Sequence, residues 1–326
     1  MNRPDQHSVK PMPMRDALLR RIWQHMAQDR NVWFVTADFG SPVLDHIRAD
    51  FPDQFVNVGI AEQNLINVSA GLALEGMTVF AYAIAPFLTM RCYEQIRISL
   101  SLLSSVRSLN VNLIGVGAGY SYVVSGPTHQ CYEDIALMRL LPNMQVYSPA
   151  DHVMAAQLFD SCLGSMGPKY LRLDAQVLPV LYEEKSSEGL SAGYRIHRQG
   201  EVISLVATGY MVHTALKVAD LLEEDGKRIG VIDVYDLNGL NESRFCETLQ
   251  RYQRIVSLEE GFTGRGGLDA LIHGMLSRYL PDLQLTALGV PNKWRFDLGD
   301  RGSLHEQAGI GLHSVYRTIQ SILSST

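Results

Sequence analysis

Residues 58–84 read VGIAEQNLINVSAGLALEGMTVFAYAI, and this pattern predicts a helix that leads into a buried strand. The composition of Glu62–Leu74 is compatible with a helix, and Val79–Ile84 is rich in β-branched and aromatic strand formers. A helix followed at once by an apolar strand is the repeating unit of α/β proteins.

The same alternation continues on both sides of this stretch. Upstream, Met14–Ala27 has apolar residues at helical spacing and precedes the strand-like run Val32–Val35. Downstream, Tyr93–Leu103 is helix-like, and Asn110–Val116 resembles a buried strand before a glycine-rich loop. Further segments of this kind are a helix over Val153–Cys162, with Asp151 as a possible cap, and a strand over Lys169–Leu173. The sequence therefore predicts a parallel α/β sheet.

The periodicity lapses after residue 180. Residues 180–199 mix Glu, Lys, Ser and Gly without clear spacing, which is typical of an exposed connection. We expect a first domain over residues 1–180, a linker over 181–200 and a smaller α/β domain over 201–326. The expected elements of the second domain are the strands Val202–Ala207, Arg228–Val234, Gln250–Leu258 and Gln284–Leu288 and the helix Val212–Glu224.

Composition excludes several classes of protein. The 326 residues carry a formal net charge of -6, which gives no electrostatic reason to expect nucleic acid. No apolar stretch approaches the roughly 18 residues of a membrane helix, and Met1–Lys10 is polar rather than signal-like, so we expect a cytoplasmic protein without a membrane partner. The 4 cysteines lie tens of residues apart, which favours reduced thiols over a metal site or a disulfide framework.

Glu62 is the first residue that points to chemistry. It stands at the start of the apolar helix, after Gly59 and before Gln63 and Asn64. A carboxylate favours a helix N-terminus, so a lone Glu there can be a simple first-turn residue. The residues alone leave both interpretations open.

Two further segments each contain side chains that could bind a ligand or transfer a proton. Pro86–Arg97 places an aromatic residue, Phe87, shortly before Arg91 and Tyr93. Ser125–Gln130 reads Ser-Gly-Pro-Thr-His-Gln and contains His129. An aromatic residue in an apolar turn, an exposed helical Arg or a single His can each be structural, and these alternatives stay open from composition alone.

Taken together, Val58–Asn64, Pro86–Arg97 and Ser125–Gln130 resemble, in order and spacing, the pyrimidine-binding domain of transketolases and of deoxyxylulose phosphate synthase. The resemblance implies a thiamine diphosphate-binding type of parallel-sheet domain followed by a transketolase C-terminal domain. It also implies thiamine diphosphate as cofactor and the transfer of a two-carbon ketol unit between sugar substrates.

The resemblance assigns roles to individual residues. Glu62 would share a proton with N1′ of the cofactor's aminopyrimidine, which favours the imino tautomer. Phe87 or its neighbour Leu88 would stack on the pyrimidine, and Arg91 would lie near the cofactor. Asp38, in Thr36-Ala37-Asp38, would lie near the thiazolium, with a helix-capping role as the alternative.

Substrate contacts are also implied. His129 would hydrogen-bond to, or exchange a proton with, the substrate oxygens while the carbon–carbon bond forms or breaks. Arg172 matches a position that binds a substrate phosphate, with an ion pair to Asp174 as the structural alternative. Ser125 stands where relatives carry an acid, and Val116–Tyr120 lacks their basic residue. We therefore expect an unusual acceptor, such as an unphosphorylated, branched or nucleotide-linked sugar.

Half of the expected cofactor site has no counterpart in the sequence. Relatives hold the diphosphate through Mg²⁺ with a Gly-Asp-Gly motif followed later by Asn. Gly299-Asp300-Arg301-Gly302 is only a superficial echo, which we interpret as a turn. The chain should therefore need an N-terminal partner subunit that binds most of the Mg²⁺ and diphosphate, in a dimer of heterodimers.

Two other functions remain as alternatives. The β subunit of a 2-oxoacid dehydrogenase decarboxylase has a similar length and two-domain plan, but the Gly126–Gln130 loop favours ketol transfer. A non-catalytic assembly subunit would have no physical need for Glu62 and His129. No catalytic residue is assigned to the second domain. The donor, the acceptor, the pathway and the partner's identity do not follow from the sequence.

Overall fold

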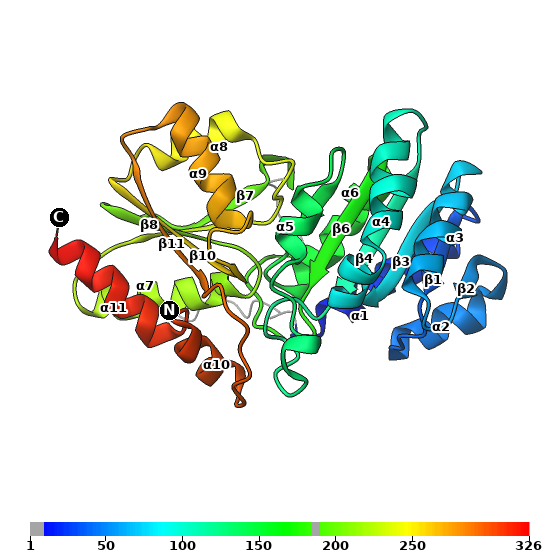
Figure 1. The fold of residues 1–326 in the computed structure, drawn as a ribbon, viewed down its shortest axis with the longest axis horizontal. Coiled ribbons are helices and arrows are strands. Elements are labelled where there is room, and N and C mark those ends of the chain that lie inside the picture. Colours follow the sequence, from blue (N-terminus) through cyan, green and yellow to red (C-terminus); the bar gives the residue numbers. More distant parts are fainter. Residues whose placement is uncertain (1–9, 184–189, 326) are drawn as a thin grey trace, which may run out of the picture.

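The computed structural model describes residues 10–183 and 190–325, which form two adjacent α/β domains (Figure 1). The first contains a six-stranded sheet of order β2-β1-β3-β4-β6-β5, in which every pairing is parallel. The second contains a five-stranded sheet of order β11-β10-β8-β9-β7, parallel except at β7. The predicted fold class, a parallel-sheet domain followed by a smaller α/β domain, is confirmed.

The first domain has these helices and strands: α1 (Met14–Met26), β1 (Val32–Thr36), α2 (Pro42–Asp50), β2 (Phe55–Asn57), α3 (Glu62–Leu74), β3 (Thr78–Ile84), α4 (Tyr93–Gln95), β4 (Asn110–Val116), α5 (Asp134–Arg139), β5 (Gln145–Tyr147), α6 (His152–Gly164) and β6 (Gly167–Leu173).

The second domain has these: β7 (Tyr194–Arg198), β8 (Ile203–Ala207), α7 (Met211–Glu224), β9 (Gly230–Val234), α8 (Glu242–Leu249), β10 (Arg254–Phe262), α9 (Leu268–Tyr279), β11 (Gln284–Val290), α10 (Arg301–Ala308) and α11 (Leu312–Ser324).

Strand periodicity explains how helices cover both faces of the first sheet. Successive side chains of a strand point to opposite faces, so in β1 Phe34 joins one apolar cluster and Val35 joins the other. Helices α1, α2 and α6 pack in the first cluster, and α3 and α5 in the second. Strand β4 is buried along its whole length, as expected for a central parallel strand covered on both faces.

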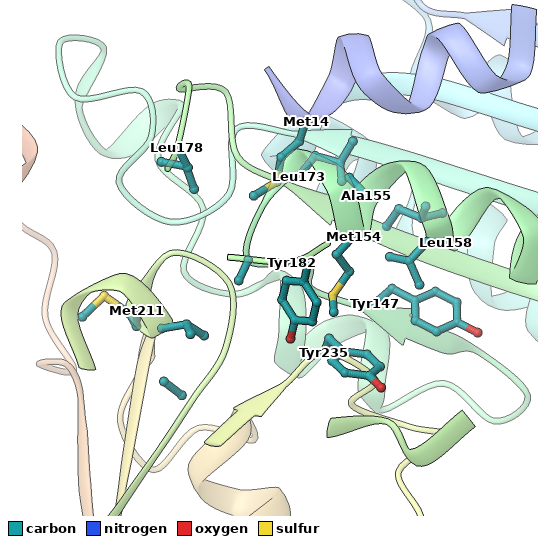
Figure 2. Packing of buried hydrophobic residues seen from close by; sticks show 14 of the residues in the cluster. Met14, Tyr147, Met154, Ala155, Leu158, Leu173, Leu178, Tyr182, Met211 and Tyr235 are labelled. Atoms are coloured by element: carbon teal, nitrogen blue, oxygen red, sulfur yellow. The ribbon is translucent and has the colours of Figure 1, made fainter. Parts of the chain in front are cut away.

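The two apolar clusters continue from one domain into the other. Figure 2 shows Tyr147 and Met154 of the first domain close to Tyr182 and to Tyr235 of the second. The Tyr182 and Tyr235 rings meet edge to face, with centroids 6.5 Å apart. The domains therefore share a packed core at their junction.

The expected linker over 181–200 is corrected by the structure. Its last part forms β7, which pairs antiparallel with β9 at the edge of the second sheet. The sequence of β7, Tyr-Arg-Ile-His-Arg, includes polar residues, which fits a strand at the edge of a sheet in which only Tyr194 is buried. Residues 184–189 of the predicted linker lie outside the described part.

The predicted helix over Tyr93–Leu103 is also corrected in type. After α4 the chain continues as a π-helix over Ile96–Leu102 and a short 3₁₀ turn over Leu103–Ser105. Another π-helical turn, Phe87–Arg91, precedes α4. Side-chain periodicity does not distinguish these wider turns from an α-helix, and π-turns occur frequently at functional sites.

Gly299–Gly302 is the start of α10. Asp300 is its N-cap and accepts a hydrogen bond from the Ser303 backbone N–H at 2.9 Å. The segment is thus a turn into a helix, and the next residue, Arg301, points into the domain interface and is buried.

A buried ionic cluster joins the domains at this point. Arg301 Nη2 lies 2.7 Å from Oε2 of Glu260, on β10, and 2.6 Å from Oδ2 of Asp174, which follows β6. Nε2 of His305 lies 2.6 Å from Glu260 Oε1. Burial alone would raise the pKa of Glu260, but Arg301 and His305 outweigh it and hold that pKa well below its usual range.

We expect Arg301→Met to lower the free energy of unfolding by about 3–5 kcal/mol, because it leaves the carboxylates of Glu260 and Asp174 buried without their cation. The measurement is urea denaturation at a fixed protein concentration. The control is Arg278→Met, which breaks the exposed pair with Glu242 and should cost under about 1 kcal/mol. Equal effects of both substitutions would contradict this account of the interface.

Candidate active site

The three segments singled out in the sequence meet at one edge of the first sheet. Residues 58–62 follow β2, the π-turn Phe87–Arg91 follows β3, and the loop over 117–131 follows β4. Because these strands are parallel, their carboxyl ends lie at the same edge, which is where open α/β sheets bind ligands.

Glu62 is the first residue of α3, and only 5% of its surface is exposed. Gly59 has a φ of 73°, which glycine adopts readily, and the chain turns sharply at this residue between β2 and α3. Arg91 Nη1 donates to Glu62 Oε1 at 3.0 Å and to Oε2 at 3.2 Å. The carboxylate therefore has a cationic partner in this chain, and the helix N-terminus also favours its negative charge.

Phe87 connects this ion pair to His129. The Arg91 guanidinium carbon lies 3.9 Å from the centre of the Phe87 ring, a cation–π contact. The other neighbour of Phe87 is His129, whose ring meets it edge to face with centroids 5.3 Å apart. Glu62, Arg91, Phe87 and His129 thus form one continuous row of contacts across three separate loops.

His129 follows a single 3₁₀ turn, Gly126–Thr128. Its Nδ1 lies 3.0 Å from the Thr128 hydroxyl oxygen, which orients the ring. Ser125 precedes the turn and is exposed. The site is therefore open to solvent on the side of this loop.

Exposed apolar residues stand close in sequence to three members of this row. Ile60 is 75% exposed, Met90 41% and Val124 84%, and each lies within five residues of Glu62, Arg91 or His129. We call these three residues the apolar rim.

Leu88 does not have the surroundings expected for a stacking residue. It is fully buried in the cluster beneath α3, whereas Phe87 is partly exposed at the site. Within the π-turn these adjacent side chains point in different directions, so the structure places Phe87 and not Leu88 beside Arg91 and His129.

Asp38 lies at the same sheet edge, after β1. It has a left-handed φ of 56° and is exposed, and its Oδ1 accepts from Asn57 Nδ2 at 3.0 Å. The capping alternative is not observed, because Ser41 is the N-cap of α2 and accepts from Leu44 N–H. Asn57 therefore holds Asp38 beside the turn that leads to Glu62.

Arg172 is not placed to receive a phosphate group. It is buried, its Nε donates to Asp134 Oδ2 at 2.9 Å, and its Nη2 donates to the Glu260 carbonyl at 3.1 Å. The sequence alternative, a pair with Asp174, is also wrong, because Asp174 pairs with Arg301. The side chain of a strand end can point into a domain interface, which sequence position alone does not reveal.

Sequence reasoning missed two residues at this edge, Arg15 and Tyr122. The Tyr122 ring occupies the space beside Gly117, where a Cβ would lie 2.1 Å from the ring. Burial raises the pKa of Tyr122, and the nearby Arg15 opposes that shift. In the sequence, Gly117 indicates that another group approaches the backbone closely. Nothing in the sequence indicates that Arg15, in the first turn of α1, lies near the site.

Comparison with known proteins identifies the family of both domains. Residues 10–180 match the family described as transketolase, pyrimidine binding domain, and residues 193–315 match transketolase, C-terminal domain. The chain belongs to the transketolase family.

Three relatives are informative. One of the subunits of an apulose-4-phosphate transketolase, from Actinobacillus succinogenes, is 30% identical over 82% of this chain and 84% of its own. The 6-deoxy-6-sulfo-D-fructose transketolase subunit SqwH from Clostridium sp. (strain MSTE9) is 26% identical over 99% and 98%. A solved structure described as "Split gene transketolase, inactive beta4 tetramer" is 29% identical, with a TM-score of 0.84, over 97% of this chain and 99% of that one. The expected resemblance of this chain to the C-terminal half of a split transketolase is thereby confirmed.

Neither a metal cluster nor a membrane-spanning helix is found among the described residues. No cluster of three or more His, Cys, Asp or Glu side chains in 10–183 and 190–325 is arranged to hold a metal ion. No helix found in those ranges is long and apolar enough to cross a bilayer.

We expect Arg91→Met to lower the free energy of unfolding of the isolated chain by no more than about 1 kcal/mol, because 48% of the Arg91 side chain is exposed to screening by water and salt and the N-terminus of α3 still stabilises the buried Glu62 carboxylate. The difference from wild type should shrink further at about 1 M salt, where the Debye length is about 3 Å. Urea denaturation at low and high salt measures both effects. Arg107→Met, an exposed cation outside the site, is the control. A cost above about 2 kcal/mol that does not respond to salt would contradict a screened ion pair.

Proposed function

We propose that this chain is the C-terminal subunit of a two-chain, thiamine diphosphate-dependent transketolase that transfers a two-carbon ketol unit between sugar or sugar-derived substrates. The observation that carries the proposal is the row of contacts from Glu62 through Arg91 and Phe87 to His129. It brings an acid, an aromatic ring and a proton-transferring group together at the ligand-binding edge of the sheet.

The residues present fit the pyrimidine half of the cofactor. Glu62 offers a carboxylate in a largely dry setting, which suits a ring nitrogen that must be protonated. Phe87 offers an aromatic face, the usual partner of a planar heterocycle. When bound, the cofactor supplies the carbon nucleophile that carries the ketol unit.

Glu62 has a defined task in this proposal. Its carboxyl group holds a proton at N1′ of the aminopyrimidine, and Arg91 keeps the same oxygens ordered in the free chain. Because Arg91 is half exposed, its side chain can move aside at a modest cost when a ring nitrogen takes its place. Arg91 and Asp38 would then border the bound cofactor.

His129 has the second task. Thr128 holds Nδ1, so Nε2 is the ring atom available for hydrogen bonding or proton transfer at a substrate oxygen. Ser125, four residues earlier and exposed, would contact the substrate where other transketolases have an acid. The second domain supplies neither group.

A second kind of chain would complete the site. This partner would carry the diphosphate-binding domain and most of the Mg²⁺ contacts, since hard oxygen ligands suit that ion. Two relatives are described as subunits, and a third as an inactive tetramer of β chains, which supports a requirement for such a partner. The apolar rim is the surface we assign to it, within a dimer of heterodimers.

The acceptor is proposed to differ from ordinary pentose phosphates. The loop over Val116–Tyr120 has no basic residue, and Arg172 is committed to Asp134, so two expected phosphate contacts are missing. Relatives act on sugars as different as a 4-phosphate and a 6-sulfo sugar, according to their descriptions. A kinetic preference for ribose 5-phosphate over unphosphorylated or branched sugars would contradict this part of the proposal.

The decisive test is ketol transfer from hydroxypyruvate, with thiamine diphosphate and Mg²⁺, for this chain alone and for its mixture with the candidate N-terminal subunit. Activity only in the mixture is the expected result. Oxidative decarboxylation of a 2-oxoacid by the mixture would instead support the dehydrogenase alternative. Inactivity toward both substrate classes in a properly assembled complex would favour a non-catalytic subunit.

We expect Glu62→Gln to reduce kcat of the assembled enzyme by about 100-fold or more, because Gln cannot hold a transferable proton at N1′. Assembly, measured by size-exclusion chromatography, should be unchanged. Glu75→Gln, at the exposed opposite end of α3, is the matched control and should keep full activity. A fully active Glu62→Gln enzyme would remove the proposed catalytic role.

We expect His129→Asn to lower kcat by about 100-fold or more, since proton transfer by a positioned side chain contributes about 10²–10⁴-fold. Thiamine diphosphate affinity, measured by calorimetry on the assembled complex, should change little because His129 is assigned to the substrate. His313→Asn, at an exposed position of α11, is the control. Loss of cofactor binding without a change in kcat at saturation would reverse the assignment.

A further inference from the structure

The loop that carries His129 is held at its base by the second domain. Glu260, near the end of β10, extends its carboxylate across the interface, and Oε1 accepts a hydrogen bond from the Tyr120 backbone N–H at 3.3 Å. Glu260 is 1% exposed. The contact therefore lies in a dry region, where a backbone N–H left without an acceptor would be costly.

The base of the loop is a single antiparallel bridge. Gly119 N–H donates to the Cys131 carbonyl at 2.9 Å, and Cys131 N–H donates back to Gly119 at 3.0 Å. This bridge closes residues 120–130, which include His129. The Glu260 contact is to the first residue inside the closed loop, so it fixes the direction in which the loop leaves the bridge.

The fit between Glu260 and the loop is close. A Cβ on Gly119 would lie 2.2 Å from Glu260 Oε2, so only glycine allows the carboxylate to approach here. Gly119 also has a φ of 54°, a conformation that favours glycine. The contact with Glu260 therefore requires glycine at position 119 both for its lack of a Cβ and for its positive φ.

Aromatic packing extends the support toward His129. The buried Tyr120 and Tyr132 rings lie 4.9 Å apart, and Tyr132 also packs against Phe262 of β10 at 5.3 Å. The Tyr132 hydroxyl donates to the side-chain oxygen of Gln130, the neighbour of His129. Both ends of the loop are therefore in contact with the second domain.

Glu260 is itself rigidly held. Arg301 binds both of its oxygens, at 3.0 Å and 2.7 Å, and His305 contacts Oε1. A carboxylate fixed by two partners in a closely packed interface has little rotamer freedom, which suits it to position a neighbouring group.

We infer that Glu260 is a positioning residue for the active site: its carboxylate oxygen, from the second domain, anchors the base of the loop over 117–131 and thereby sets the place of His129. The effect on catalysis rests on the proposed ketol transfer, whereas the anchoring of the loop does not. The second domain, to which the sequence assigned no catalytic residue, thus contributes to the site through a backbone contact.

The first measurement is hydrogen–deuterium exchange of the isolated chain, followed in peptides that cover residues 117–132. We expect Glu260→Ala to speed exchange at Tyr120 by about tenfold, because its N–H loses a buried acceptor. Glu260→Gln keeps an acceptor oxygen and should leave the loop close to wild type even if it lowers overall stability. Unchanged loop exchange in Glu260→Ala, in a folded protein, would overturn the inference.

Glu259→Gln is the matched control. Glu259 precedes Glu260 on β10 and is equally buried, but its Oε1 accepts from the Asp269 backbone N–H, within the second domain. Burial raises the pKa of Glu259 to about 7, so Gln resembles its protonated form. Exchange of the loop should not respond to this substitution. Loop exchange as fast as in Glu260→Ala would show a general loosening of β10 and overturn the inference.

Gly119→Ala tests the same contact from the first domain, in case Glu260→Ala does not fold. The added methyl group displaces the Glu260 carboxylate and should also speed exchange at Tyr120, while peptides from β1 keep their protection. Normal protection at Tyr120 in this variant would show that the contact does not hold the loop.

Activity of the assembled complex supplies the second readout. We expect Glu260→Ala to reduce kcat at least tenfold with the donor KM changed less than threefold, and Glu260→Gln to restore most of that loss. Equal kcat losses in both variants would assign the effect to interface charge and overturn the positioning role. If the wild-type complex transfers no ketol unit but loop exchange still responds as expected, the proposed function fails and the anchoring stands.

Discussion

The packing of the two domains against each other depends on the contacts of the buried Glu260 carboxylate. It lies in the dry interface, where an unpaired charge is costly, and so it requires the cation of Arg301 and the ring of His305. Arg301 in turn reaches Asp174 at the end of the first sheet, and Arg172 links Asp134 to the Glu260 carbonyl. Of these ion pairs, Arg301–Asp174 crosses the interface, and the hydrogen bond from Arg172 to the Glu260 carbonyl is a second contact between the domains.

Much of the fold follows from the sequence because parallel strands covered on both faces must be apolar throughout. The run Asn110–Val116 meets that condition, and it is the buried central strand β4. An edge strand need not be apolar throughout. The polar sequence of β7 therefore looks like that of a loop between domains. The π-turns do not follow from the sequence because apolar spacing does not distinguish them from an α-helix.

The residues of the candidate site could be located from the sequence where a short segment carries its own chemical groups. The turns around Glu62 and His129 contain these residues together with the glycines that shape the backbone. By contrast, the contacts of Arg91, Phe87 and Arg172 depend on the directions of side chains in three dimensions. Leu88 and Phe87 are adjacent in sequence, yet one is in the core and the other at the site. A pattern of residue types cannot separate such neighbours.

The apolar rim has a consequence for the life of the protein before assembly. A newly made copy exposes Ile60, Met90 and Val124 to water, and exposed apolar side chains favour association between unassembled chains. Balanced synthesis of the two kinds of chain would then be a requirement for solubility as well as for catalysis. If this chain works with a second polypeptide as proposed, its abundance would have to match that of the partner, because an excess of this chain would leave the apolar rim uncovered.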